Sequence, residues 1–148
     1  MRLVSVYKNK DAPRVLWEIM KVRLKEKQAV NISHRKMPTW KQHLAFIRSR
    51  ANGAWYLIYG NMFYYSDGES EEVCVGWVYL NRRSEIGVMI FPDFRRSGYG
   101  EEAVSAIIKK HPRQHYLANI NPKNKRSIKF FKRLGFKDCI QQTFEKRA

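Results

Sequence analysis

Apolar and polar residues follow two kinds of pattern along this chain, and together they predict an α+β fold. Alternation, or a short apolar run, predicts strands at residues 3–7, 54–65, 73–80, 86–91, 115–120 and 136–145. Apolar residues at helical spacing predict helices at residues 13–27, 39–49, 103–110 and 124–135. The order of these elements describes a mixed sheet with helices on both faces.

The stretch from Glu85 to Lys110 is predicted to form a strand, a turn and a helix. The turn contains two arginines, a serine and two glycines, in the order Arg95-Arg96-Ser97-Gly98-Tyr99-Gly100. Glycine lets a ligand approach the backbone, and amides at a helix N-terminus beside positive side chains bind phosphate. Taken alone, the turn fits a tight connection with solvated arginines better than a phosphate cradle. A dinucleotide-binding loop and a P-loop both fit poorly, because the third glycine and the Gly-Lys-Ser/Thr end are missing.

Length and charge narrow the class of protein. The chain has 148 residues, 44% of them hydrophobic, which favours a single globular domain over disorder. Its net charge of +16 is uneven, with +10 in residues 1–50, −4 in residues 51–108 and +10 in residues 109–148. Basic ends favour polyanionic partners such as coenzyme phosphates, a nucleotide-linked substrate or nucleic acid, and solvated helix faces account for about half of the charge.

The cysteines and the start of the chain predict a cytoplasmic protein. Cys74 and Cys139 are the only two cysteines and are widely spaced, so we read them as reduced thiols. No apolar run approaches the length needed to span a membrane, and the first residues lack a signal-peptide pattern.

Two motifs resemble those of a known family. Arg95 to Gly100 matches the (Gln/Arg)-x-x-Gly-x-(Gly/Ala) signature of the GNAT superfamily, the acetyl-CoA-dependent N-acetyltransferases. Residues 121–136 are similar to its second motif, in which an Asn begins a helix and an aromatic-x-x-Leu-Gly-Phe sequence ends it. The resemblance implies one GNAT domain over residues 1–148, with a central, mostly antiparallel mixed sheet of six to seven strands. Residues 31–38, 55–58 and 118–124 look like those of small bacterial and phage members associated with surface-sugar biosynthesis.

The resemblance also implies a site for acetyl-CoA as co-substrate, with no metal. The amides of Arg96, Ser97, Gly98, Tyr99 and Gly100 should receive the pyrophosphate with Arg95 nearby, and the backbone of Val88, Met89 and Ile90 should face the pantetheine arm. Asn124 lies where the family contacts the coenzyme, but an Asn here equally predicts a helix N-cap. Phe131 lies at the coenzyme where many members carry a tyrosine as general acid, and it cannot donate a proton. The thiolate then leaves unprotonated, since a thiol pKa is about 8.5, or Tyr116 or a bound water protonates it.

Candidates for chemistry at the amine come from the same resemblance. Glu85 is the predicted general base, because family members often carry a carboxylate there that acts through water; a solvated charge facing Arg82 or Arg83 is the structural alternative. His34 is the alternative base, since its imidazole titrates near neutral pH. His34, Met37 and Trp40 are expected to line the acceptor pocket, and Asn119 and Asn121 to hold an acceptor hydroxyl or amide. Each has a structural alternative: a surface position for His34, core packing for Met37 and Trp40, and turn formation for the two asparagines.

These observations predict an enzyme that moves an acetyl group from acetyl-CoA directly to a primary amine. No cysteine has a recognisable histidine partner, so a covalent enzyme intermediate is not expected. The expected acceptor is a small-molecule amine, namely an amino sugar, either free or linked to a nucleotide. The alternatives are a protein or aminoacyl-tRNA amine, and a coenzyme- or nucleic-acid-binding module without catalysis; nucleic acid is not the favoured partner. Monomer and homodimer both stay open.

Overall fold

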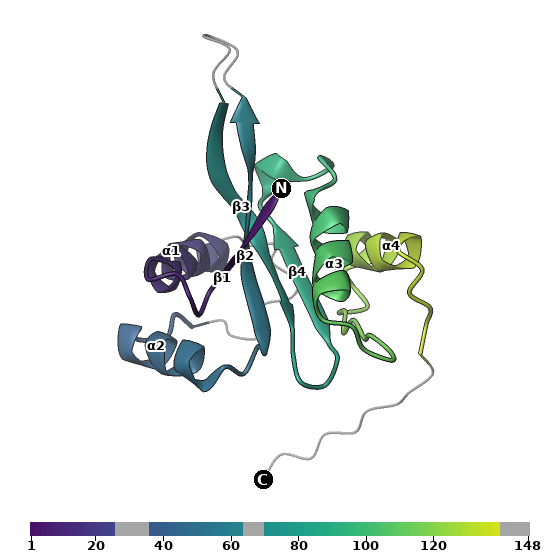
Figure 1. Ribbon diagram of the computed structural model, residues 1–148, viewed down its shortest axis with the longest axis horizontal. Helices are drawn as coiled ribbons and strands as arrows, with labels where there is room; N and C mark the ends of the chain where they lie inside the picture. Colours follow the sequence, from purple (N-terminus) through teal and green to yellow (C-terminus); the bar gives the residue numbers. More distant parts are fainter. Residues whose placement is uncertain (26–35, 64–69, 140–148) are drawn as a thin grey trace.

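The computed structural model describes residues 1–25, 36–63 and 70–139. The elements, in chain order, are β1 (Arg2–Ser5), α1 (Ala12–Lys25), α2 (Trp40–Ser49), β2 (Ala54–Phe63), β3 (Ser70–Leu80), β4 (Ile86–Ile90), the 3-10 helix η1 (Pro92–Phe94), α3 (Tyr99–Lys110) and α4 (Lys125–Arg133). The four strands form one antiparallel sheet in the order β1-β2-β3-β4, so β1 and β4 are its two edges. Figure 1 shows α1 and α2 on one face of this sheet and α3 and α4 on the other. The predicted α+β class and the helices on both faces are confirmed.

The expected number of strands is wrong for the described residues, because the structure has four strands and not six to seven. The predicted strand at 115–120 is reduced to one parallel bridge, in which Leu117 pairs with Glu85. The hydroxyl of its neighbour Tyr116 bonds back to the end of α3, donating to the His111 carbonyl at 3.1 Å. It also accepts from the Arg113 amide at 2.7 Å, so this segment packs against the end of α3 and does not continue as a strand beside β4. Of the predicted last strand, residues 136–139 are not extended in a sheet, and the remainder lies outside the described residues.

Each face of the sheet buries its own core, and the alternation of β2 explains why. Tyr56 and Ile58 face α3 and α4, whereas Trp55 and Leu57 face α1 and α2. The β2–β3 register shifts after Ile58, so that Val75 becomes an extra residue in β3. This bulge turns Val75 into the α3 side and reverses the alternation that follows.

The helix ends follow the signals in the sequence. The Gln42 amide donates to the Thr39 hydroxyl at 3.3 Å, and the Thr39 amide donates to the Gln42 side chain at 2.8 Å, which completes a capping box at α2. At α4, Asn124 caps the helix by accepting from the Ser127 amide at 3.1 Å. Gly135, just after this helix, has a φ of 87°, the left-handed conformation expected of a glycine there.

Candidate active site

β4 is an edge strand, and its outer edge is only partly paired. Among the described residues, its first residue, Ile86, bonds to Leu117, and no strand pairs with the residues after it. The Phe91 amide donates to Val75 at 2.9 Å, so odd-numbered residues here direct their backbone groups to β3. By strand alternation, Val88 and Ile90 direct theirs to the outer edge, whereas Met89 pairs with β3. The Ile90 carbonyl accepts from Arg95 Nε at 3.2 Å. Within residues 1–25, 36–63 and 70–139, the backbone of Val88 is therefore unpaired at this edge, whereas that of Met89 faces β3.

The start of α3 lies just beyond the end of β4 and lacks a side-chain cap. Its N-cap is Gly98, with a φ of 80°, and no side-chain hydrogen bond closes the first turn. The amides of Tyr99, Gly100 and Glu101 precede the first helical bond, from the Glu102 amide to the Gly98 carbonyl at 3.0 Å. A Cβ built on Gly98 would meet no atom within 4 Å, so its backbone borders open space. Uncapped amides beside open space are the kind of group that binds an anion, so this helix start is the candidate anion site.

Two packing contacts fix this helix start beside the open edge. A Cβ on Gly100 would lie 3.2 Å from the Phe130 ring and 3.5 Å from an Ile90 side-chain carbon, so glycine allows α3, α4 and β4 to meet here. The Tyr99 hydroxyl bonds both the amide and the carbonyl of Asn61 at 3.2 Å, which ties the helix start to β2. The Tyr99 side chain is thus structural, and its amide remains at the anion site.

Glu85 lies at the other end of β4 and lines a cavity of about 320 Å³. Asn81 holds one carboxylate oxygen through its side-chain amide, at 2.6 Å. The cavity is formed by two turns, and its other lining residues are Ser49, Arg50, Ala51, Asn81, Arg82 and Arg83. Burial raises the pKa of nearby Tyr79, and the negative charge of Glu85 adds to this rise. Three residues of strand, roughly 10 Å, separate Glu85 from the open backbone of Val88.

Tyr116, the side chain considered for protonating the thiolate, forms hydrogen bonds elsewhere, and Phe131 is buried. The Tyr116 hydroxyl donates to the carbonyls of His111 at 3.1 Å and Ile108 at 3.4 Å, at the C-terminal end of α3. Phe131 is 6% exposed, and its ring lies 5.1 Å from the rings of Phe130 and Phe136. Neither side chain is brought together with Glu85 by any contact in the described part of the chain.

The predicted asparagines form turns and caps. Asn121 accepts from the Lys123 amide at 2.9 Å, and Asn124 caps α4 as described above. Asn119 is exposed in the connection between α3 and α4. These hydrogen bonds support the turn role of Asn121 and the cap role of Asn124. The cap uses the side-chain oxygen of Asn124, so its side-chain NH₂ can still bind another partner.

The predicted acceptor residues before α2 are only partly described. Trp40 is 43% exposed, and its ring packs against Trp17 at 5.2 Å and His43 at 5.4 Å. Met37 is half-buried just before the helix. His34 lies outside the described residues. Trp40 thus joins an aromatic cluster between α1 and α2, on the face of the sheet that Met89 also contacts.

Sequence reasoning missed Arg50 as a neighbour of Glu85. Arg82 and Arg83 adjoin Glu85 in sequence and are named with it in the sequence analysis, but Arg50 follows the end of α2 and comes from another part of the chain. Gly53 explains the meeting, because a Cβ there would lie 2.5 Å from the Leu80 carbonyl oxygen. Only a glycine lets the α2–β2 turn approach the β3–β4 turn this closely.

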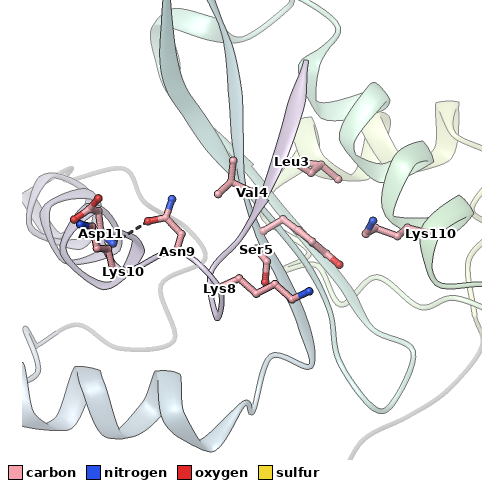
Figure 2. A pocket seen from close by; sticks show the side chains of 9 residues that line it. Leu3, Val4, Ser5, Lys8, Asn9, Lys10, Asp11 and Lys110 are labelled. Atoms are coloured by element: carbon pink, nitrogen blue, oxygen red, sulfur yellow. Dashed lines mark hydrogen bonds between the residues drawn. The ribbon is translucent and has the colours of Figure 1, made fainter.

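A larger cavity of about 600 Å³ lies at the opposite edge of the sheet, beside β1 (Figure 2). Lys8 from the turn after β1 and Lys110 from the end of α3 line it, together with Tyr56. Because β2 and β3 lie between β1 and β4, this cavity is separate from the Glu85 cavity. Within the described ranges, no cluster of His, Cys, Asp and Glu side chains could hold a metal ion, and no helix is long and apolar enough to span a membrane.

The comparisons with known proteins agree with this geometry. Residues 2–137 match the family model of the acetyltransferase (GNAT) domain. The chain belongs to the GNAT acetyltransferase family. A comparison with curated protein sequences finds no match. The predicted enzyme class and acetyl-CoA as co-substrate are thereby confirmed, and the amine acceptor is not determined by membership of the family.

Solved structures share the fold at low sequence identity. A domain from Methanocaldococcus jannaschii is 23% identical, with a TM-score of 0.68 over 93% of this chain and 90% of that one. AAC(6')-Iy, solved with the bisubstrate analogue CoA-S-monomethyl-acetylneamine, is 17% identical, with a TM-score of 0.66 over 99% and 97%. The yncA protein of Salmonella typhimurium, solved with its cofactor acetyl-CoA, is 18% identical, with a TM-score of 0.62 over 92% and 80%.

Proposed function

We propose that this GNAT acetyltransferase transfers the acetyl group of acetyl-CoA directly to the primary amine of a small molecule, an amino sugar. The observation that carries the proposal is the open backbone of Val88, which lies between an uncapped helix start and the Glu85 cavity. In this proposal the first-turn amides of α3 hold the coenzyme pyrophosphate, and the edge from Val88 to Ile90 holds the pantetheine arm. The acceptor amine then approaches from the Glu85 end.

The chemistry needs one proton acceptor and one leaving group. The amine nitrogen forms a bond to the acetyl carbon, the carbon–sulfur bond breaks, and the amine loses a proton to Glu85, directly or through a water. The sulfur leaves as a thiolate and takes its proton from solvent, since the hydroxyl of Tyr116 is bonded to backbone and Phe131 has none. A thiol pKa of about 8.5 makes that departure feasible near neutral pH.

Glu85 has the surroundings that a general base needs. The Asn81 side chain donates to one carboxylate oxygen, which fixes the group and leaves its other oxygen for a substrate proton. Arg50, Arg82 and Arg83 line the same cavity. A base must be oriented before the amine arrives, and the hydrogen bond from Asn81 supports this role for Glu85.

The amino sugar is favoured over the other acceptors by the size of the cavity and by one structural neighbour. A cavity of about 320 Å³ fits a small molecule better than a protein surface. The bisubstrate analogue bound to AAC(6')-Iy joins CoA to acetylneamine, so a chain of this fold accepts such an amine. Acetylation of a protein or aminoacyl-tRNA amine is the second candidate, and a cytoplasmic location suits either reaction.

The test is thiol release from acetyl-CoA against amino sugars, nucleotide-linked amino sugars, polyamines, peptides and aminoacyl-tRNA. We expect turnover with amino sugars, and a fall of roughly 10²–10⁴-fold in kcat for Glu85→Gln, with coenzyme binding unchanged. Glu18→Gln, which removes an exposed carboxylate in α1, is the matched control and should keep full activity. Tight acetyl-CoA binding without turnover of any amine would refute the proposal and favour a binding module.

A further inference from the structure

Three arginines from two turns surround the cavity that contains Glu85. Arg50 comes from the end of α2, and Arg82 and Arg83 come from the β3–β4 turn. All three side chains are exposed, and none forms an ion pair with a carboxylate of the described residues. Arginines that line one cavity and have no acidic partner among the described residues leave guanidinium donors for a ligand.

The β3–β4 turn holds its backbone rigidly without using the two arginine side chains. The Asn81 side-chain oxygen accepts from the amides of Arg83 at 2.9 Å and Glu85 at 3.0 Å. The Asn81 carbonyl accepts from the Ser84 amide at 3.2 Å. The turn is thus closed by Asn81, and replacing either arginine side chain removes none of these bonds.

Arg50 is fixed by a different set of contacts. Its backbone adopts the left-handed conformation, with a φ of 53°, and its amide caps α2 by donating to the Ile47 carbonyl. Its guanidinium lies over the Tyr7 ring, 5.0 Å from the ring centre. The close approach of Gly53 to Leu80 then holds this turn against the one that carries Arg82 and Arg83. Three arginines on two fixed turns therefore line a cavity that contains one carboxylate.

We propose that Arg50, Arg82 and Arg83 bind a phosphate group on the acceptor, so that the substrate is a phosphate-bearing amine with its nitrogen at Glu85. The identification of the ligand as the acceptor rests on the proposed function. The cavity carries three positive charges and one negative charge, which matches a molecule with one ammonium and one phosphate. Polyamines, which carry only positive charge, would be repelled by the arginines. Arginine suits phosphate because its planar fork donates two parallel hydrogen bonds.

The first arm of the test compares acceptors that differ in phosphate. Glucosamine, glucosamine 1-phosphate, glucosamine 6-phosphate and a uridine-diphosphate-linked glucosamine are assayed by thiol release. We expect kcat/KM to be about tenfold higher or more for at least one phosphorylated amine, and the panel separates a sugar phosphate from a nucleotide-linked sugar. Arg82→Gln/Arg83→Gln should remove this preference, so that in this variant kcat/KM for the phosphorylated amine is no higher than for glucosamine. Lys8→Gln/Lys110→Gln removes the same charge from the opposite edge and should keep the preference.

The second arm measures binding without catalysis. Glucose 1-phosphate and uridine-diphosphate-glucose lack the amine and are titrated calorimetrically while desulfo-CoA fills the coenzyme site. Arg50→Gln and the double arginine variant should weaken this binding about tenfold, with unchanged thermal unfolding. Arg82→Lys/Arg83→Lys keeps the positive charges and loses the planar guanidinium groups. Its affinity for these ligands should lie between that of the wild type and that of the double glutamine variant.

The two arms separate the failure of this inference from the failure of the proposed function. Arginine-dependent binding without turnover of any amine would refute the acetyl transfer and keep the phosphate site. Turnover of free and phosphorylated amines at equal kcat/KM, or a preference untouched by the arginine variants, would overturn the inference and keep the acetyl transfer. Turnover confined to aminoacyl-tRNA would also overturn it, because the phosphate would then belong to a macromolecule.

Discussion

Two glycines with nearly the same backbone conformation provide a test of the coenzyme site. Gly98 begins α3 with a φ of 80°, and Gly135 follows α4 with a φ of 87°. A Cβ on either glycine would meet no heavy atom within 4 Å. Gly98→Ala and Gly135→Ala therefore impose the same backbone strain and create no clash, and they differ in what lies in front of the added methyl group.

The two effects can be estimated separately. A left-handed alanine costs about 1–2 kcal/mol of folding free energy, so both variants should lower Tm by roughly 2–8 °C. At Gly98 the methyl group enters the open space beside the uncapped amides of α3. Displacing an anion from one such amide costs about 1.5–3 kcal/mol, which corresponds to a loss of roughly tenfold to a hundredfold in affinity.

The assay pairs calorimetric binding of acetyl-CoA with thermal unfolding. We expect weaker coenzyme binding for Gly98→Ala alone, with similar Tm losses for the two variants. Equal affinities for acetyl-CoA in Gly98→Ala and Gly135→Ala would refute the assignment of the pyrophosphate to the start of α3. Binding is the informative quantity here, because both proteins lose stability for the same reason.

Two further predictions concern stability. Phe131→Ala should lower the free energy of unfolding by about 3–5 kcal/mol, since Phe131 is 6% exposed, while Phe46→Ala, at 45% exposure, should cost far less in the same urea titration. Burial lowers the pKa of His43, partly offset by its hydrogen bond to the Pro13 carbonyl. The unfolded chain therefore binds more protons than the folded chain below about pH 6.5. The free energy of unfolding should decrease there as the pH is lowered. Urea unfolding between pH 5 and 7.5 should show a flatter profile for His43→Asn, and parallel profiles would contradict this.

The parts of the fold that local chemistry determines could be predicted from the sequence. Thr39 and Gln42, three positions apart, form a capping box, and Gly135 follows α4 where the backbone is left-handed. Both signals lie within one helical turn. The predicted strand at 115–120 has the right alternation and still forms only one bridge, and its Tyr116 hydroxyl donates to the His111 carbonyl at the end of α3. Alternation shows which side chains are apolar, but it does not show whether a neighbouring strand pairs with the backbone.

The candidate site also contains residues that the sequence could indicate and one residue that it could not. The turn at Gly98 and the carboxylate of Glu85 adjoin β4 in sequence, so motif and position could indicate both. Arg50 could not be placed, because its distance from Glu85 depends on the contact between Gly53 and the Leu80 carbonyl. That contact joins two turns separated by the whole of β2 and β3. A glycine that follows a helix end is common, and the sequence does not reveal what it packs against.

The single bridge at Leu117 also decides where the edge of β4 is open. The Ile86 amide donates to the Leu117 carbonyl at 2.7 Å, and the Leu117 amide donates to the Ser84 carbonyl at 2.8 Å. These bonds close the edge at the Glu85 end and fix the cavity there, while Val88, two residues further along, is left unpaired in the described part of the chain. A full fifth strand would have paired Val88 with backbone instead. The reduction of the predicted strand at 115–120 to one bridge and the unpaired backbone of Val88 are thus two sides of one observation, and the proposed pantetheine site depends on both.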